Sequence, residues 1–305
     1  MFNFFFKNKV HFFYTESPFQ LLQVYELIKL ENIKNFKILI RLNIVDKNNQ
    51  QLIKLVKVLN LKNVKYLKVF TKNKINLILL VFKILLSIIN SKKVFIEPSS
   101  GVFRMLSTFF NKEKFVLIDD GVATLLKNSK LNLYDKFSIF QNILPNTKLN
   151  NFVNIKKFAL KYKTKKNVNI IIGSNYSELN IVKQKIYFKM LEVIKLKTKS
   201  SGELIYIPHR GENDEKLKLI QNYLGITVLK AKLPIELVNY EFGIMPLVVH
   251  STTSTAMFSM KLIYEKSKFI SYKFNNIHLI ERKKNIMKFN KIMNNFKFIK
   301  KIQVN

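Results

Sequence analysis

The sequence predicts an α/β protein built from two doubly wound parallel sheets, one in each half of the chain. Short apolar runs alternate with segments whose apolar residues recur at helical spacing, and this alternation occurs twice. A length of 305 residues suits two domains of roughly 150 residues each. A hydrophobic content of 48%, with 13% aromatic residues, is enough to form two cores. We therefore expect one domain over residues 1–150 and another over residues 151–305.

The first half opens with a strand, a tight loop and a helix. The apolar run Val10 to Thr15 stops at Glu16, Ser17 can cap the next helix, and Pro18 suits its first turn. The pattern then repeats. We expect further strands at 36–42, 64–70, 93–97 and 115–118, and helices at 49–59, 77–89 and 101–110.

The second half repeats the alternation after a weaker stretch from about Leu131 to Lys166, which we interpret as a connector. We expect strands at 169–172, 204–207, 227–229 and 242–250, and helices at 176–195, 213–223, 235–240 and from about 254. Each run of alternating strands and helices predicts a parallel sheet covered by helices.

The chain is strongly basic, with a formal net charge of +34. The types of basic residue indicate what this charge is for. Four of the 53 basic residues are arginine and the other 49 are lysine, spread along the whole chain. This favours a generally basic surface, with weak attraction to an anionic membrane as the alternative. Nucleic-acid binding is disfavoured because no arginine-rich stripe or base-stacking motif occurs. The absence of cysteine excludes disulfides and thiolate metal sites.

The termini and apolar runs predict a cytoplasmic protein that can lie peripherally on the inner membrane face. Met1 to Phe6 is apolar, but the Lys7 to Lys9 segment that follows is a poor cleavage region for a secretory signal. The longest apolar run, Ile75 to Ile89, contains Asn76 and Lys83 and is too short to span a membrane. We expect it to form a buried or interfacial helix.

Carboxylates that follow predicted strands are candidate catalytic residues, because ligands bind at the carboxyl ends of such strands. Asp119 and Asp120 follow the run Phe115 to Ile118, and Gly121 lets the backbone approach a ligand closely. Either carboxylate could accept a proton from an acceptor hydroxyl or hold sugar hydroxyls. The alternative is a helix cap with a first-turn acid. A metal site is not expected, because adjacent side chains on an extended segment point apart and no third ligand is evident.

A second candidate site follows the run Leu204 to Ile207. Pro208, His209, Arg210 and Gly211 stand just before a predicted helix, so cationic side chains and backbone N–H groups can converge on an anion. A protonated His209 could donate to a leaving phosphate. Arg210 is notable in a chain that otherwise uses lysine. The alternative is a strand-end histidine bonded to a carbonyl beside a surface arginine.

Two further segments carry polar groups at predicted strand ends. Ser251, Thr252, Thr253 and Ser254 precede a helix and can bind phosphate oxygens or simply cap that helix. The turn Gly173, Ser174 and Asn175 leads to Glu178. Glu178 could serve as a capping-box acid or as a general base, and the sequence leaves both open.

Taken in order, these blocks resemble bacterial sialyltransferases of glycosyltransferase family 52 and the related capsular polysialyltransferase-like group. Ser17-Pro18-Phe19-Gln20-Leu21-Leu22 with Glu26 looks like the first strand–helix turn of that family. Asp119-Asp120-Gly121 looks like its acidic-Asp-Gly element, and Gly173 to Glu178 is similar to the start of its second domain. Tyr206-Ile207-Pro208-His209-Arg210 resembles its Pro-His-Pro-Arg block, which meets the nucleotide phosphate.

Two late blocks extend the resemblance, which covers about residues 10 to 260. Pro234-Ile235-Glu236 and Ser251 to Ser254 are similar to elements that hold cytidine and phosphate in such enzymes. Two departures stand out. Arg210 occupies the place of a second proline, and Glu178 aligns only approximately with the second-domain acid of the family. Asp119 or Asp120 is therefore an alternative base.

The resemblance implies a GT-B architecture, in which two Rossmann-like domains face a central cleft. It also implies an acceptor-side N-terminal domain and a C-terminal domain that binds CMP-sialic acid. The expected reaction transfers sialic acid with inversion to a glycan of lipooligosaccharide or capsule, with no metal and no cofactor. His209 would act as acid or phosphate stabiliser. The predicted donor contacts are Gly173, Ser174, Asn175, Arg210, Glu236 and Ser251 to Ser254.

Two alternatives remain open from the sequence. One is a GT-B transferase that uses another nucleotide sugar or a polyol phosphate in capsule synthesis. The other is a non-catalytic anion-binding protein of the same fold, which would bind anionic polymers in a salt-dependent manner. Nothing in the sequence indicates an oligomeric state.

Overall fold

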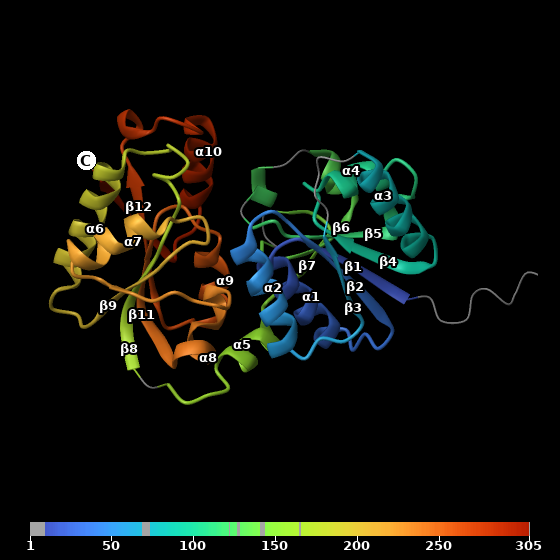
Figure 1. The fold of residues 1–305 in the computed structure, drawn as a ribbon, viewed down its shortest axis with the longest axis horizontal. Coiled ribbons are helices and arrows are strands. Elements are labelled where there is room, and N and C mark those ends of the chain that lie inside the picture. Colours follow the sequence, from blue (N-terminus) through green and yellow to red (C-terminus); the bar gives the residue numbers. More distant parts are fainter. Residues whose placement is uncertain are drawn as a thin grey trace, which may run out of the picture. The chain divides into compact units, whose positions relative to one another are not determined.

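The computed structural model describes residues 10–68, 74–121, 123–126, 129–140, 144–164 and 166–304. The chain forms two compact units, Met1–Ile155 and Lys156–Asn305 (Figure 1). Each unit is an α/β structure with its own parallel sheet.

The first unit is built on a seven-stranded parallel sheet with the order β3-β2-β1-β4-β5-β6-β7. Its strands are β1 Val10–Thr15, β2 Phe36–Leu42, β3 Val64–Lys68, β4 Ser91–Ile96, β5 Phe115–Ile118, β6 Asp135–Ser138 and β7 Thr147–Leu149. Its helices are α1 Pro18–Leu30, α2 Asp46–Val58, α3 Lys74–Ile89 and α4 Gly101–Leu106. The order reverses between β1 and β4, which makes these two strands the topological switch point of the sheet.

The period of two along β1 divides its side chains between the two faces of this sheet. Phe12 and Tyr14 join a core cluster with residues of α3 and α4. Phe13, on the opposite face, stacks on Phe95 at 4.5 Å between ring centroids. The sequence-predicted cap of α1 is confirmed, because the Ser17 hydroxyl accepts the Gln20 backbone N–H in a capping box.

The helix α5, Val153–Ala159, crosses from the first unit to the second, and its N-terminus is capped by a carboxylate from α1. Glu26 is buried and accepts the backbone N–H groups of Asn154 and Ile155 at 2.9 to 3.0 Å. A carboxylate at a helix N-terminus satisfies free N–H groups and the helix dipole. Glu26 therefore stabilises the chain just before the boundary.

The second unit contains a six-stranded parallel sheet with the order β10-β9-β8-β11-β12-β13. Its strands are β8 Lys166–Ile172, β9 Leu204–Ile207, β10 Thr227–Val228, β11 Ile244–Ser251, β12 Lys268–Phe274 and β13 Ile299–Val304. Its helices are α6 Gln184–Thr198, α7 Asp214–Asn222, α8 Val238–Phe242, α9 Ala256–Ile263 and α10 Lys283–Asn294. Here the order reverses between β8 and β11.

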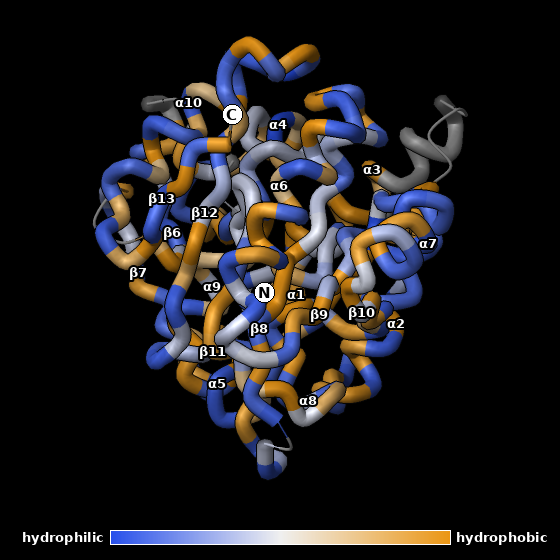
Figure 2. Tube along the Cα trace, turned by 90° about the vertical axis from the view of Figure 1, so that its left-hand side faces the viewer, coloured by the Kyte–Doolittle hydropathy of each residue, from blue (hydrophilic) through white to orange (hydrophobic). Residues whose placement is uncertain are grey.

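Helices α6 and α7 lie on one side of this sheet and α9 on the other (Figure 1). The buried faces of α6 and α7 pack with Ile171 of β8 and Tyr206 of β9 in one core cluster. Figure 2 shows hydrophobic stretches alternating with hydrophilic ones along the chain, which is the pattern from which the elements were predicted.

The predicted fold class of two doubly wound parallel sheets is confirmed, and several element boundaries are corrected. The stretch 131–166 is no plain connector, because it contributes β6, β7 and α5. The predicted helix 176–195 begins only at Gln184, since residues 176–181 form turns closed by backbone hydrogen bonds such as Ile181 N–H to the Tyr176 carbonyl at 2.7 Å. The strand predicted at 64–70 is observed to Lys68, and its last two residues lie outside the described residues.

Across the described ranges, no helix is both long enough and apolar enough to cross a membrane.

Candidate functional site

Three of the sequence-predicted segments meet at the switch point of the second sheet. Residues 173–175 follow β8, residues 208–212 follow β9, and Ser251 ends β11. β8 pairs with both β9 and β11, with Ile172 in register with Ile207 and with Ser251. Because the strands are parallel, all three segments emerge at the same edge, where α/β sheets bind ligands.

His209 is held by its own loop. Its Nδ1 accepts the Gly211 backbone N–H at 3.1 Å, and its backbone N–H donates to Glu212 Oε2 at 2.6 Å. His209 is an exposed residue. Desolvation and the nearby Arg210 lower its pKa to about 4, and the charge of Glu178 opposes this shift. The imidazole is therefore neutral at pH 7, in contrast to the protonated form expected from the sequence. With Nδ1 accepting, the proton sits on Nε2, which is a hydrogen-bond donor.

Arg210 and Glu236 form the second part of this site. Glu236 lies in a short 3-10 helix, Ile235–Leu237, and its buried carboxyl group accepts the Ser259 hydroxyl at 2.6 Å. Burial raises the pKa of Glu236, against the opposing effects of Ser259 and Arg210. Burial lowers the pKa of Arg210, and Glu236 opposes that shift, so the two groups interact electrostatically. The structure thus places two predicted donor contacts, from different strand ends, within electrostatic reach of each other.

Glu178 is bound to the start of α7. Its Oε1 accepts the backbone N–H of Asn213, the cap residue of α7, at 3.2 Å, and its Oε2 pairs with Lys216 at 3.2 Å. Despite partial burial, Lys216 and these hydrogen bonds hold the pKa of Glu178 below its ordinary value. The predicted capping-box role is wrong, because α6 begins six residues later and Glu178 serves α7 instead.

A buried ion pair that sequence reasoning missed supports this site. Lys216 is 1% exposed and pairs with Glu212 at 2.8 Å, while its Nζ also donates to the Ser174 carbonyl at 2.8 Å. The same ammonium lies 4.0 Å from the centroid of the Tyr187 ring. Glu212 in turn accepts the Tyr206 hydroxyl at 2.5 Å. The spacing of four between Glu212 and Lys216 was the available signal for this pair.

Gly173 makes room for this ion pair. A Cβ atom at Gly173 would overlap Glu212 Oε2 and would lie 2.7 Å from the Tyr206 hydroxyl oxygen. The glycine predicted to contact the donor therefore has a packing role. Gly211 is similar, because a Cβ there would lie 2.7 Å from Asn175 Nδ2. The predicted turn at 173–175 thus packs against the His209 loop.

The remaining predicted contacts differ in their surroundings. The buried Ser174 hydroxyl has no hydrogen-bond partner among the described residues, so a polar ligand atom or a water would complete its bonding.

Ser251 and Thr252 are buried at the end of β11, whereas Thr253 and Ser254 are partly exposed before α9. Ser254 Oγ accepts the Ala256 N–H at 3.3 Å and Thr253 Oγ1 donates to Asn290 at 3.3 Å. Thr253 and Ser254 are thus the accessible members of this set.

In the first unit, Asp119 and Asp120 follow β5 and differ sharply in exposure. Asp119 is 1% exposed, and its Oδ2 accepts the Ile139 N–H at 2.9 Å. Burial raises the pKa of Asp119 to about 7, with a smaller contribution from Asp120. Asp120 is partly exposed and accepts the Ser99 hydroxyl at 3.1 Å. The two carboxylates have different partners, as expected for adjacent residues on an extended segment.

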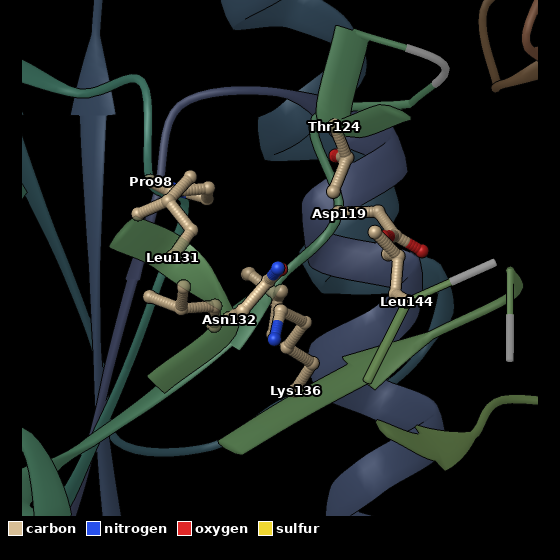
Figure 3. A pocket seen from close by; sticks show the side chains of 9 residues that line it. Pro98, Asp119, Thr124, Leu131, Asn132, Lys136 and Leu144 are labelled. Atoms are coloured by element: carbon tan, nitrogen blue, oxygen red, sulfur yellow. The ribbon is translucent and has the colours of Figure 1, made fainter. Parts of the chain in front are cut away.

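The backbone at Asp119 is fixed by α1. Gln23, fully buried, donates to the Asp119 carbonyl at 2.9 Å and accepts the Asp119 N–H at 3.0 Å. Figure 3 shows Asp119 and Thr124 lining a small pocket together with Lys136. Its volume of about 20 Å³ holds about one water molecule. Asp120 is the more exposed member of the pair.

Glu16 and Glu97, the other strand-end acids of the first unit, are used within the fold. Glu16 pairs with Arg41 at 3.1 Å and accepts the Tyr14 hydroxyl at 2.8 Å. Glu97 is buried and accepts the Ser99 N–H. Within the described residues, no group of three or more histidine and acidic side chains could hold a metal ion.

No protein-family model matches the chain, and no curated protein matches its sequence. Solved structures do match. A protein assigned as a UDP-N-acetylglucosamine 2-epimerase from Listeria monocytogenes has a TM-score of 0.61 at 11% identity, over 98% of this chain and 85% of its own.

Two further structures match at similar coverage. An α/β-galactoside α-2,3-sialyltransferase from the luminous marine bacterium Photobacterium phosphoreum has a TM-score of 0.52 at 15% identity, over 97% of this chain and 99% of its own. The UDP-GlcNAc 2-epimerase of Methanocaldococcus jannaschii has a TM-score of 0.52 at 13% identity, over 95% and 94%. At such identities the similarity concerns the fold. The chain has the two-domain GT-B fold.

Proposed function

We propose that this chain is a glycosyltransferase that transfers sialic acid from CMP-sialic acid to a cell-surface glycan, with inversion and without a metal. The observation that carries the proposal is that His209 and Arg210 follow β9 and Thr253 and Ser254 follow β11 at one edge of the second sheet, with Glu236 within electrostatic reach of Arg210. The resemblance to glycosyltransferase family 52 supplies the donor, and the GT-B fold of the sialyltransferase neighbour agrees with it.

The donor phosphate is proposed to bind beside His209. A neutral imidazole with its proton on Nε2 donates a hydrogen bond to a phosphate oxygen, and Arg210 supplies the positive charge. Both interactions strengthen as negative charge develops on the departing CMP, which is the condition for stabilising a transition state. A phosphate dianion beside His209 would also raise its pKa, which favours proton transfer to the leaving group.

Glu236 is proposed to recognise the base of the nucleotide. Its carboxyl group is buried, and that burial raises its pKa. A carboxyl group at this position can accept a hydrogen bond from the amino group of cytosine. The bond from Ser259 fixes its orientation.

The base for the acceptor hydroxyl is proposed to be Asp120, with Asp119 as its buried neighbour. Glu178, the alternative, is already occupied by Lys216 and the start of α7, and its lowered pKa makes it a weak proton acceptor. Asp120 is partly exposed on a backbone that Gln23 and Thr124 hold in place. A carboxylate held at a fixed, accessible position meets the geometric requirement for a general base.

The reaction is tested with the full chain and CMP-sialic acid, by following CMP release with and without a lipooligosaccharide-type acceptor. We expect slow release without acceptor and faster release with it. No turnover and no affinity for CMP, together with salt-dependent binding to anionic polymers, would instead support a non-catalytic anion-binding protein.

A second candidate function is transfer of a different nucleotide-linked sugar. The observation that favours it is Arg210, which replaces the second proline of the family block and adds a charge suited to a diphosphate. UDP- and GDP-sugars tested in parallel distinguish the two functions, because each predicts release of a different nucleotide.

A further inference from the structure

Helix α3, Lys74–Ile89, carries an apolar stripe on its outer face. Phe82, Leu86 and Ile89 are 58%, 51% and 57% exposed. Their spacing of four and three residues aligns them along one side of the helix. Single exposed apolar side chains are common on proteins, but three large ones in a row on one helix are not.

The opposite face of the same helix is packed in the core of the first unit. Ile84 and Ile88 are both completely buried and pack with Val102, Phe103 and Leu106 of α4. The helix is therefore anchored to the first unit by one apolar face while a second apolar face remains on the surface. After α4, Phe109 is also 70% exposed. Folding of this unit alone leaves the outer stripe without a partner among the described residues.

Most charged residues in the chain segment that contains this stripe are basic. The segment from Lys74 to Lys114 contains seven basic and two acidic residues, and one of those acids, Glu97, is buried. Lys92, Arg104 and Lys112 are exposed. Lys114 Nζ lies 3.5 Å from the carbonyl oxygen of Ile89, the last residue of the stripe. An apolar stripe and cationic side chains thus occur together in this segment.

We propose that the outer face of α3 docks the protein on an anionic phospholipid surface. A helix that lies in the membrane interface inserts apolar side chains at the boundary of the acyl chains, while lysine and arginine contact anionic headgroups. This docking surface belongs to the first unit alone and is independent of the sugar donor.

A second copy of this chain is a less suitable partner for the stripe than an anionic membrane. Each copy carries a formal net charge of +34, and the charged side chains exposed in this segment are mostly cationic, so two copies repel each other there. An anionic bilayer attracts those cations and accepts the apolar side chains. Charge complementarity therefore selects the lipid surface.

The test is flotation of the full chain with vesicles of phosphatidylcholine containing about 30% phosphatidylglycerol, compared with phosphatidylcholine alone. The variant combines Phe82→Gln, Leu86→Gln and Ile89→Gln. Glutamine is a good helix former, and these side chains are half exposed, so the fold is retained. We expect wild-type protein to float with the anionic vesicles. The variant should bind them at least ~10-fold more weakly, because interfacial binding scales with buried apolar area.

A matched control changes three exposed apolar residues elsewhere, with Leu196→Gln, Leu219→Gln and Tyr223→Gln. We expect this control to float like wild type. Raising salt from about 0.1 M to about 0.5 M should weaken binding of wild type, because the headgroup contacts are screened. Unchanged melting temperatures for both variants establish that they are folded.

Three results would overturn the proposal. One is equal flotation of wild type and the α3 variant, and another is an equal loss in the control variant. The third is a concentration-dependent dimer of wild type, seen by sedimentation in the absence of lipid and abolished by the α3 variant. That result would identify the stripe as a contact between copies.

Discussion

His209 shows how a loop sets the chemistry of one side chain. Its Nδ1 is occupied by the Gly211 N–H, and its backbone is held by Glu212, so one ring nitrogen remains to meet a ligand. We predict that His209→Ala lowers the rate of transfer by at least ~100-fold, the usual effect of losing an acid–base group. The rate of CMP release measures this effect.

The matched control for that variant is His278→Ala. His278 lies in a short 3-10 helix after β12, away from the switch-point segments in sequence. We expect its rate to be close to wild type. A folded His209→Ala protein with a normal rate would remove His209 from the mechanism.

The choice of base gives a second prediction at this scale. Asp120→Asn should lower transfer by about 100-fold, because the amide cannot accept the acceptor proton. Glu178→Gln should lower it by less than about 10-fold, since its role is to bind Lys216 and α7. The transfer rates of the two variants, measured at saturating donor, distinguish the two candidate bases. The reverse order of effects would make Glu178 the base.

His250 gives a prediction on acid stability. It is 2% exposed, its Nδ1 lies 3.2 Å from the Tyr272 hydroxyl, and burial lowers its pKa to about 4. A histidine with a lowered folded pKa stabilises the fold above its unfolded pKa, and that stability is lost as pH falls toward the folded value. From pH 7 to pH 5, we expect His250 to account for a loss of about 2 kcal/mol.

Urea denaturation of wild type and His250→Gln across this pH range measures that contribution. The variant should lose less stability on acidification, whatever its absolute stability at pH 7. Parallel pH dependences for the two proteins would mean that His250 does not titrate in this way.

At the scale of elements, Lys216 of α7 joins the β8 turn to the start of α7, because it pairs with Glu212 and donates to the Ser174 carbonyl. Gly173 is the position at which this packing leaves no space for a side chain. We predict that Gly173→Ala lowers the free energy of unfolding by at least ~2 kcal/mol, because overpacking displaces a buried ion pair. Gly101→Ala is the control, since a Cβ there would meet nothing within 4 Å. Its stability should equal wild type or exceed it slightly, and equal losses in both variants would contradict the packing argument.

The sequence predicted elements well where pattern and capping agree. β1, β2, β5 and β9 have the predicted bounds because their apolar runs end at clear polar or turn residues. The start of α6 was missed because Tyr176, Leu179 and Val182 recur every three residues, as in a helix, whereas backbone hydrogen bonds fold this segment into turns. β6 and β7 were missed because these short strands carry few apolar residues, and Lys136 of β6 is buried although it is charged.

The sequence predicted which segments form the candidate site, but it did not predict which side chains contact one another. The strand-end rule brought residues 173–175, 208–212 and 251–254 to one edge, since that follows from parallel topology alone. The orientation of individual side chains depends on tertiary neighbours. Glu178 is bound by Lys216, and Asp119 is buried where it accepts the N–H of Ile139, next to β6. Neither contact corresponds to a sequence motif.

At the scale of the molecule, the two units have different proposed roles. The second contains the groups suited to a nucleotide phosphate, and the first contains Asp120 and the exposed stripe of α3. The strong positive charge favours approach of an anionic donor as well as an anionic surface. The GT-B fold is compatible with several nucleotide sugars, so the donor is the decisive question.

The most direct measurement is a donor comparison with purified full-length protein. CMP-sialic acid, UDP-sugars and GDP-sugars are incubated with wild type and His209→Ala, and the released nucleotide is quantified. The proposed function predicts that CMP is released, that release is at least ~100-fold slower in His209→Ala, and that UDP and GDP stay at background. Release of UDP or GDP in place of CMP, or equal release by the two proteins, would contradict it.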